Sequence, residues 1–456
     1  MVEIIIKKDD KDLVEKSTDL VTKYLENYQY DDILYFIKET HNADIAEVLQ
    51  NLDPVLRLSL INIIDKNFDP EILTYLNDSL REEIIETLDI KQLATNAKSL
   101  DIDDAVDLVE DLEEKNQNIF LQNLEKEERT LVEEGLTYPE DSAGRLMQRQ
   151  FVAVDKSWNV GQAIDYLRNN KKKLPDDFYD IYLLNTKKEV RGIVPLGRLM
   201  GSKREIALNS IINKELRLIE VNADQEDVAL LFSKYGLVSA PVIDNSKKII
   251  GSITVDDVVE VIEEEREEDI LKLGGVDHTD LYETVLSTTK SRISWLIVNL
   301  MTAVVASIVI GIFEAAIEKV VALAILMPIV ASMGANAGTQ TLTVAVRALA
   351  VKELTANNAL KIIIKETLIG GINGLIFAVI ISLVSIYWFE NFMLGVIIGL
   401  AMILNLILAG FAGTIIPLAL EKLKIDPALA SAVILTTITD VFGFLSFLGL
   451  ATIFLI

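Results

Sequence analysis

Asp440 is the carboxylate that most clearly indicates chemistry, because it lies within a long apolar run, SAVILTTITDVFGFL. A carboxylate at the centre of a membrane span costs about 2.5–3.5 kcal/mol on insertion scales, so the surroundings must compensate for it. Two interpretations are open. Asp440 either hydrogen-bonds a neighbouring Ser or Thr or is protonated, or it faces a hydrated path and attracts cations.

A second set of polar residues occurs in another apolar stretch, MPIVASMGANAGTQTLTVAVRALA. Pro328 interrupts helical hydrogen bonding there, and small or polar groups follow at membrane depth, namely Gly334, Asn336, Thr339 and Gln340. Close packing of small residues is one explanation of this pattern. The other is that carboxamides and freed backbone carbonyls offer oxygen ligands to a hard cation or to its water shell.

This combination of groups favours Mg2+ as the transported cation, although Mn2+ and Co2+ also fit it. Mg2+ gives up water reluctantly and is usually held through retained waters and one or two carboxylates. One Asp440 per chain meets this need if two subunits meet on a two-fold axis. A homodimer with an ion site between its subunits is therefore a hypothesis that these residues support.

Acidic clusters in the first 290 residues suggest that the same ion is also sensed. The formal net charge is −26, and all of it precedes Ser291, since the segment from Ser291 to Ile456 holds eight basic and eight acidic residues. A segment with this much negative charge repels nucleic-acid phosphates, so no nucleic-acid partner is expected. The clusters are Asp103/Asp104/Asp107, Asp256/Asp257/Glu260 and the helix EVIEEEREED. They are either solvated surface or sites where divalent ions cross-link carboxylates and close the pore.

Missing residue types exclude several classes of site. The chain has no Cys, which rules out disulfides, thiolate metal sites and Cys nucleophiles. Its two His residues, His41 and His278, make zinc or copper chemistry improbable. No combination of nucleophile and base is apparent, so we expect no enzymatic activity.

Four segments with different patterning must position these groups, and together they predict a multi-domain membrane protein. Residues 1–140 read as short amphipathic helices of a helical superhelix. Residues 141–262 repeat an α/β pattern of strand, helix, strand, turn, strand and helix, which resembles a pair of CBS domains. Residues 263–290 form an acidic connecting helix, and residues 291–456 form an all-α bundle of five transmembrane helices, near 293–313, 320–346, 367–389, 392–420 and 428–456.

The basic residues of the connections predict the orientation of this bundle. Lys352, Lys361 and Lys365 lie between the second and third spans, and Lys422 and Lys424 lie between the fourth and fifth. Because basic residues favour the cytoplasmic side, the N-terminal part is expected in the cytoplasm and the C-terminus outside. The start, MVEIIIKKDDKD, has no long apolar region, so no cleavable signal peptide is expected.

A nucleotide site is also possible in the second CBS half. Gly251, Thr254 and Asp257 have the G-x-x-T-x-x-D spacing with which many CBS modules hold a nucleotide such as ATP, with the Thr near phosphate and the Asp near ribose. The same residues suit a strand-to-helix cap.

Four motifs resemble the MgtE family of magnesium channels, in the family's order and over nearly the whole chain. They are YPEDSAGRLM, TVDDVVEVIEEEREEDILKLGG, GANAGTQTLTVAVRALA and DPALASAVILTTITDVFGF. The resemblance implies a homodimer in the cytoplasmic membrane that imports Mg2+. The helical domain, the CBS pair and a plug helix would close the pore when intracellular Mg2+ is high.

The resemblance also implies roles for individual residues. Asp440 is the pore carboxylate and Asn336 lies in the matching element, GANAG, where Ala335 replaces a frequent Gly. A position of the second CBS half that can be acidic in the family is Gly236 here. The sensing acids correspond to Glu226, Asp257, Glu260, Glu268, Asp269, Asp426 and either Asp103 or Asp104.

Two other classes of function compete with a channel. A secondary carrier would use Asp440 to relay protons or to couple Na+ to the movement of divalent cations, but the spans show no convincing inverted repeat. A membrane-anchored nucleotide sensor without transport would not need polar groups within two spans.

Overall fold

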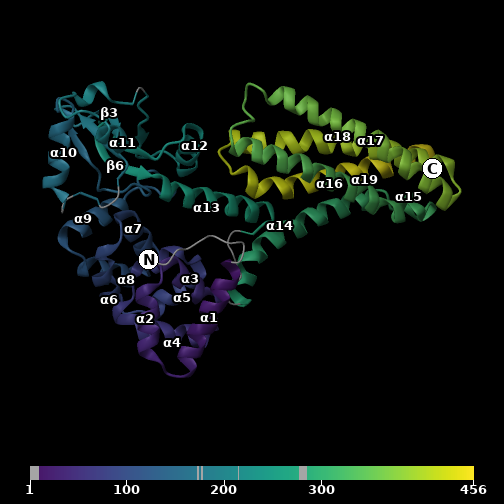
Figure 1. Ribbon diagram of the computed structural model, residues 1–456. Coiled ribbons are helices and arrows are strands. Elements are labelled where there is room, and N and C mark those ends of the chain that lie inside the picture. Colours follow the sequence, from purple (N-terminus) through teal and green to yellow (C-terminus); the bar gives the residue numbers. More distant parts are fainter. Residues whose placement is uncertain (1–9, 172–173, 176–177, 214, 277–284, 456) are drawn as a thin grey trace. The chain divides into compact units, whose positions relative to one another are not determined.

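The computed structural model describes residues 10–171, 174–175, 178–213, 215–276 and 285–455 (Figure 1). These residues divide into two compact units between Glu264 and Glu265. The first unit contains the strands and most of the short helices, and the second contains the long apolar helices.

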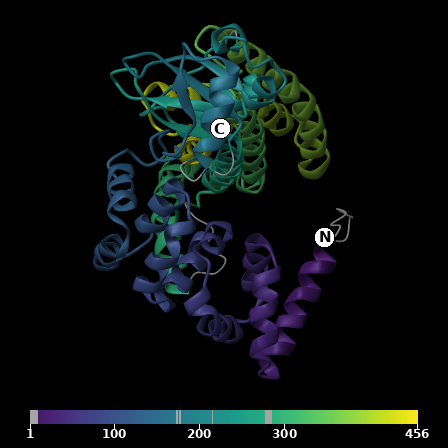
Figure 2. The same cartoon turned by 60° about the vertical axis from the view of Figure 1, so that its left-hand side comes forward.

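Short helices make up the N-terminal part of the first unit, and Figure 2 shows them in purple and blue, apart from the teal strands. Asx residues and prolines mark the starts of several of these helices. Asn77 Oδ1 accepts a hydrogen bond from Leu80 N at 3.0 Å, and Pro54 occupies the first turn of its helix. The helices are α1 (Asp10–Glu26), α2 (Tyr30–Glu39), α3 (Asn42–Asn51), α4 (Pro54–Ile64), α5 (Asp78–Thr87), α6 (Ile90–Asn96), α7 (Ile102–Glu110), α8 (Glu114–Asn123) and α9 (Lys126–Gly135), with 3-10 turns at Asp65–Asn67, Pro70–Tyr75 and Ala97–Ser99.

One continuous apolar core joins these helices, with fully buried side chains such as Ile33, Leu49 and Phe120. Arg57 is buried with them, and its guanidinium donates to the carbonyl of Leu49 at 2.8 Å and contacts Glu83 at 2.9 Å. A buried cation with these partners links α3, α4 and α5, as expected for a stack of helices that share one core.

The two predicted CBS halves have the same order of elements. In each, a parallel strand pair is followed by an antiparallel pair, giving the sheets β1-β2-β3 and β4-β5-β6. The first half comprises β1 (Ala153–Asp155), α10 (Val160–Asn169), β2 (Asp180–Leu184), β3 (Val190–Pro195) and α11 (Leu196–Met200). The second comprises β4 (Ile219–Glu220), α12 (Gln225–Tyr235), β5 (Ser239–Ile243), β6 (Ile249–Thr254) and α13 (Val255–Leu273), with a 3-10 turn at Leu208–Ser210 between the halves.

Two features join the halves to each other and to the segment before them. The hydroxyl of the buried Tyr182 on β2 lies 2.5 Å from Ser252 Oγ on β6 and 3.1 Å from Ser239 Oγ on β5. The segment that precedes the first half packs into the core of the second half, where Ala143 N donates to Ala223 O at 2.7 Å. The α/β repeat that the sequence predicted is therefore present.

The boundary expected at residues 262 and 263 falls inside α13, which runs from Val255 to Leu273 without a break. No Gly or Pro occurs within it, so the change to acidic composition does not interrupt the helix. It ends at Gly274 and Gly275, the second with φ of +72°, a left-handed conformation that favours glycine. Residues 277–284 of the expected connecting segment lie outside the described residues, and the next helix begins at Val285, ahead of the boundary expected at Ser291.

Five helices of the second unit are long and apolar enough to cross a membrane, as predicted: α14 (Val285–Ile312), α16 (Ala322–Ala350), α17 (Ala359–Phe389), α18 (Phe392–Lys422) and α19 (Pro427–Leu455). A short helix, α15 (Glu314–Lys319), lies between the first two. Figure 1 shows α16 to α19 side by side. Lys361 and Lys365, expected in a connection, occupy the first turns of α17.

Glycines allow these long helices to approach closely. A Cβ on Gly374 of α17 would lie 3.0 Å from the backbone of Ile403, and one on Gly413 of α18 would lie 2.8 Å from the carbonyl oxygen of Gly338. Gly370 and Gly410 are closer still to backbone atoms of the facing helix. Small residues at helix contacts are typical of bundles in membranes, where van der Waals packing replaces the hydrophobic effect.

Candidate ion pathway and regulatory sites

Asp440 lies near the midpoint of α19 and is partly buried. The hydroxyls around it are engaged elsewhere: Thr436 and Thr437 donate to the carbonyl of Val433 at 3.1 and 2.7 Å, and Thr439 donates to the carbonyl of Leu435 at 3.1 Å. Among the described residues, none hydrogen-bonds or pairs with the Asp440 carboxylate. The interpretation of Asp440 as the hydrogen-bond partner of a neighbouring Ser or Thr therefore has no support in the structure.

Asn336, Thr339 and Gln340 are exposed on one face of α16. Ser332 and Thr343 extend this face by one turn in each direction, and Asn336 Nδ2 donates to Ser332 Oγ at 3.3 Å. Lipid tails offer no hydrogen-bond partners, so a polar face on a membrane span requires water, an ion or another protein surface against it. We call these five residues the α16 polar face.

Gly334, predicted together with these residues, points elsewhere. It is buried against the side chain of Asn405 on α18, which occupies the space where a Cβ would stand. Gly334 therefore serves helix packing, which was one of the two explanations that the sequence left open.

Asn405 is a buried polar residue that the sequence analysis did not single out. It is fully buried, its Nδ2 donates to Val330 O on α16 at 2.9 Å, and its Oδ1 has no partner among the described residues. The signal for it was a single Asn in the otherwise apolar run GLAMILNLILAG.

Carboxylates of α7 and of the start of α13 influence one another within the first unit. Burial and then the charge of Asp257 raise the pKa of Asp103 well above its ordinary value, and the buried Oδ1 of Asp103 has no hydrogen-bond partner in the part of the chain that the structure describes. Burial raises the pKa of Asp104 to about 7, with Asp101 and Asp257 adding to it. The pKa of Asp257 is likewise raised to about 7, chiefly by burial, and that of Glu260 rises for the same reason.

This arrangement brings together four of the predicted sensing acids, Asp103, Asp104, Asp257 and Glu260. We call them the α7–α13 acidic cluster. Within the described part of the chain, no three or more acidic or His side chains converge closely enough to hold a metal ion in the present conformation. Burial is the main cause of these raised pKa values, and the charges of neighbouring carboxylates add to it for Asp103 and Asp104. A bound cation would favour the charged forms.

Glu268 and Asp426, two further predicted sensing acids, are bridged by a cation of the chain itself. Lys272 Nζ lies 2.8 Å from Asp426 Oδ2 and also contacts Glu268, one turn before it on α13. Asp426 caps α19 through Ala428 N at 2.8 Å. Nearby, burial and the charge of Asp426 raise the pKa of Asp269. The ammonium group shows that these carboxylates can share one positive charge.

Glu226 lies on the first turn of α12, where its side chain is exposed and its backbone N–H donates to Asp224 at 2.9 Å. At the other end of α12, Gly236 has φ of +59° and caps the helix. A left-handed residue at this position favours glycine, which accounts for the departure from an acidic residue.

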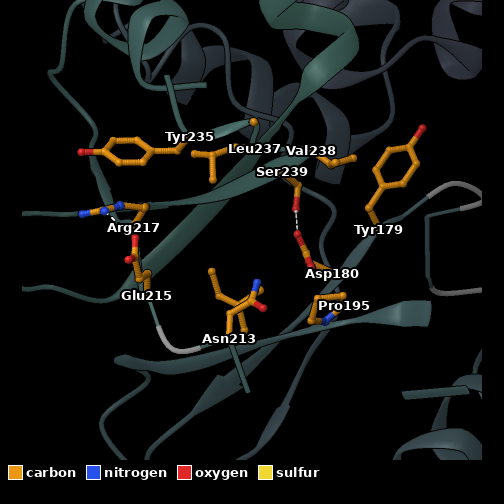
Figure 3. A pocket seen from close by; sticks show the side chains of 12 residues that line it. Tyr179, Asp180, Pro195, Asn213, Glu215, Arg217, Tyr235, Leu237, Val238 and Ser239 are labelled. Atoms are coloured by element: carbon orange, nitrogen blue, oxygen red, sulfur yellow. Dashed lines mark hydrogen bonds and ion pairs between the residues drawn. The ribbon is translucent and has the colours of Figure 1, made fainter. Parts of the chain in front are cut away.

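A cavity of about 310 Å3 lies between the two CBS halves (Figure 3). Asp180 accepts a hydrogen bond from Ser239 at 2.7 Å on one side of it, and on the other the Arg217 guanidinium lies 4.0 Å from the centre of the Tyr235 ring. Arg217 also contacts Glu215 at 2.6 Å.

The predicted nucleotide residues do not line this cavity. The hydroxyl of Thr254 donates to Asp257 at 2.7 Å, at the point where β6 passes into α13, and the space beside Gly251 is filled by Met147 and Gln148. These contacts match the alternative interpretation of the motif as a strand-to-helix cap.

Comparison with known proteins bears on the chain as a whole. The family model for MgtE, a divalent cation transporter, matches residues 327–450, the MgtE intracellular N domain matches 40–141 and the CBS domain matches 208–264. The magnesium transporter MgtE of Thermus thermophilus is 30% identical over 427 residues, which cover 92% of this chain and 94% of that protein. This chain belongs to the MgtE family.

Two further proteins are similar to this chain. The magnesium transporter MgtE of Bacillus subtilis is 29% identical over 448 residues, 94% of this chain and 99% of that protein. The crystal structure of the cytosolic domain of the Mg2+ channel MgtE in complex with ATP is 24% identical, covers 54% of this chain and 99% of that chain, and has a TM-score of 0.49. The MgtE match over 327–450 includes the α16 polar face and Asp440.

Proposed function

We propose that this MgtE protein is a channel that imports Mg2+ across the cytoplasmic membrane. The observation that carries the proposal is Asp440, a carboxylate at the middle of a span with no protein partner among the described residues. A carboxylate so placed is stabilised by water and a passing cation, and Mg2+ with its retained waters suits a site with few protein ligands. The names of the relatives, magnesium transporters, support the choice of ion.

The α16 polar face would supply the rest of the pathway. Asn336 and Gln340 offer carboxamide oxygens to the water shell of the ion, and Thr339 adds a hydroxyl. In a homodimer related by a two-fold axis, both copies of this face and of Asp440 would be available to one ion. The exposure of these polar side chains in the isolated chain supports an interface or pathway there.

The acidic groups would close the channel when cytoplasmic Mg2+ is high. The residues fit a divalent ion in two respects: the orphaned, buried Oδ1 of Asp103 among repelling carboxylates, and the bridge that Lys272 makes between Glu268 and Asp426. Bound Mg2+ would neutralise the α7–α13 acidic cluster at one place and join α13 to the start of α19 at the other. Asp269 and Glu226 are proposed as further ligands.

We place the N-terminal part in the cytoplasm and the C-terminus outside. Lys361 and Lys365 lie near the start of α17, and Lys422 and Lys424 lie at and just beyond the end of α18, so this orientation puts all four on the cytoplasmic side. A nucleotide such as ATP would bind the CBS pair. The cavity beside Tyr235 and Asp180 offers an aromatic ring and a polar wall for a base and a ribose, and it lies apart from the predicted Gly251, Thr254 and Asp257.

A transport assay separates a channel from a carrier. Purified protein in liposomes is given an inward Mg2+ gradient and a potential that is negative inside, with the same pH and Na+ concentration on both sides. We expect uptake that follows the Mg2+ gradient and the potential, and that persists when a proton or Na+ gradient is never imposed. Uptake that requires either gradient would instead identify an ion-coupled carrier.

A further inference from the structure

Asn405 is the most unusual polar residue of the transmembrane bundle. Its side chain is fully buried where α16, α18 and α19 meet, with Nδ2 bonded to Val330 O at 2.9 Å. Burying an amide with an unpartnered oxygen is unfavourable, and an apolar side chain of similar size would avoid that cost. Packing alone therefore does not explain an Asn at this position.

Two glycines on different helices make room for this amide. Gly334 of α16 has no space for a Cβ because the Asn405 carboxamide fills it, and a Cβ on Gly443 of α19 would lie 2.8 Å from Asn405 Nδ2. The amide thus contacts both neighbouring helices. It sets how closely each of them approaches α18.

These two glycines are close in sequence to the proposed ion ligands. Gly334 precedes Asn336 by two residues on α16, and Gly443 follows Asp440 by one helical turn on α19. A shift of either helix at Asn405 would therefore move the side chains on which the ion pathway depends. The orphaned Oδ1 leaves one further acceptor between α16 and α19.

We infer that Asn405 is a positioning residue of the ion pathway, which fixes the spacing of α16 and α19 and thereby the placement of Asn336 relative to Asp440. The inference rests on the proposed pathway. Asn405 acts through helices and not by contact with the ion, so it should affect how well Mg2+ is bound and distinguished more than whether the protein folds.

The test compares Asn405→Leu with two matched controls in full-length protein reconstituted in liposomes. Leu keeps the branching at Cγ and removes the hydrogen bond, and we expect half-saturating Mg2+ to rise about tenfold and the preference for Mg2+ over Ca2+ to fall. Ser385→Ala is the first control, since the side chain of Ser385 on α17 is also fully buried and its hydroxyl has no partner among the described residues. It should leave both quantities unchanged.

A second variant, on α19, perturbs the Asn405 carboxamide without changing Asn405 itself. Gly443→Ala would press a methyl group on Asn405 and should weaken Mg2+ binding and selectivity in the same direction. Gly449→Ala, on the same helix, meets its nearest atom only at 4.0 Å and should have no effect. If Asn405→Leu does not fold, Gly443→Ala decides the question.

Wild-type half-saturation and selectivity in both Asn405→Leu and Gly443→Ala would overturn the inference. The proposed function is judged separately, by uptake in the unmodified protein and its loss in Asp440→Asn. A protein that transports Mg2+ through Asp440 but is indifferent to Asn405 would refute the positioning role alone.

Discussion

At the scale of single residues, the packing of the transmembrane helices depends on glycines at positions where a Cβ would clash with the facing helix. Gly370 of α17 faces the backbone of Leu406 on α18 at less than the usual contact distance of a Cβ, and backbone atoms cannot move aside as a flexible side chain can. Gly311, by contrast, has open space around the position of its missing Cβ.

Gly370→Ala is therefore expected to destabilise the bundle by about 1–3 kcal/mol, the usual range for overpacking. Gly311→Ala should be neutral or slightly stabilising, because Ala favours a helix over Gly. Thermal unfolding of both variants in the same detergent measures the difference. Equal transition temperatures would show that the close approach of α17 to α18 is not maintained.

A second expectation at residue scale concerns the α16 polar face. Because the chain has no Cys, a single introduced Cys can be labelled selectively. Thr339→Cys should react with a charged, water-soluble thiol reagent if this face lines a hydrated path. Val379→Cys on α17 is also exposed in the isolated chain, with exposed Leu375 and Leu383 one turn away on either side, and it should react much more slowly. Similar rates at both positions would contradict a hydrated path along Thr339.

At the scale of elements, α7 and α13 meet through carboxylates whose pKa values are raised. For Asp104 and Asp257 the rise is from 3.8 to about 7, chiefly through burial. Between these limits the folded state binds more protons than the unfolded state, so stability falls as pH rises through this window. Above about pH 7 the stabilisation that protonation of these carboxyls gives to the folded state is lost. A divalent cation that neutralises the carboxylates therefore stabilises the folded state most in that range.

Without divalent ions, the thermal transition of the soluble part of the full-length protein should therefore rise as pH is lowered from 8 to 6. The further rise that Mg2+ causes should be smaller at pH 6, since protons already reduce the repulsion. Asp104→Asn should weaken this pH dependence, and Asp31→Asn, at an exposed position of α2, should not. A Mg2+ effect as large at pH 6 as at pH 8 would argue against these carboxylates as the sensor.

The end of α13 offers a second test at the scale of elements. Lys272 bridges Glu268 and Asp426, so its positive charge holds α13 against the start of α19 without Mg2+. Lys272→Met removes this bridge, and we expect more uptake at low cytoplasmic Mg2+ with inhibition at high Mg2+ retained. Lys156→Met, on an exposed turn, is the matched control. Unchanged uptake at low Mg2+ would show that the bridge does not hold the channel closed.

At the scale of the whole molecule, sequence patterning predicts the architecture because hydropathy and periodicity report directly on burial. The five spans, the short helices and the repeated α/β halves all follow from such patterns. What it does not predict is which helices meet. Gly334 reads as a pore residue until Asn405 of another helix is placed against it. The patterning likewise does not predict that one unbroken helix, α13, runs through the expected boundary at residues 262 and 263.

The most direct test of Asp440 as the pore carboxylate is Mg2+ uptake into liposomes by the unmodified protein and by Asp440→Asn. The gradient and the potential are fixed, and Mg2+ is varied on the side of the N-terminal part. We predict that the mutant loses uptake, and that millimolar Mg2+ on that side suppresses uptake by the unmodified protein. Full uptake by Asp440→Asn would remove this carboxylate from the pathway and contradict the central claim.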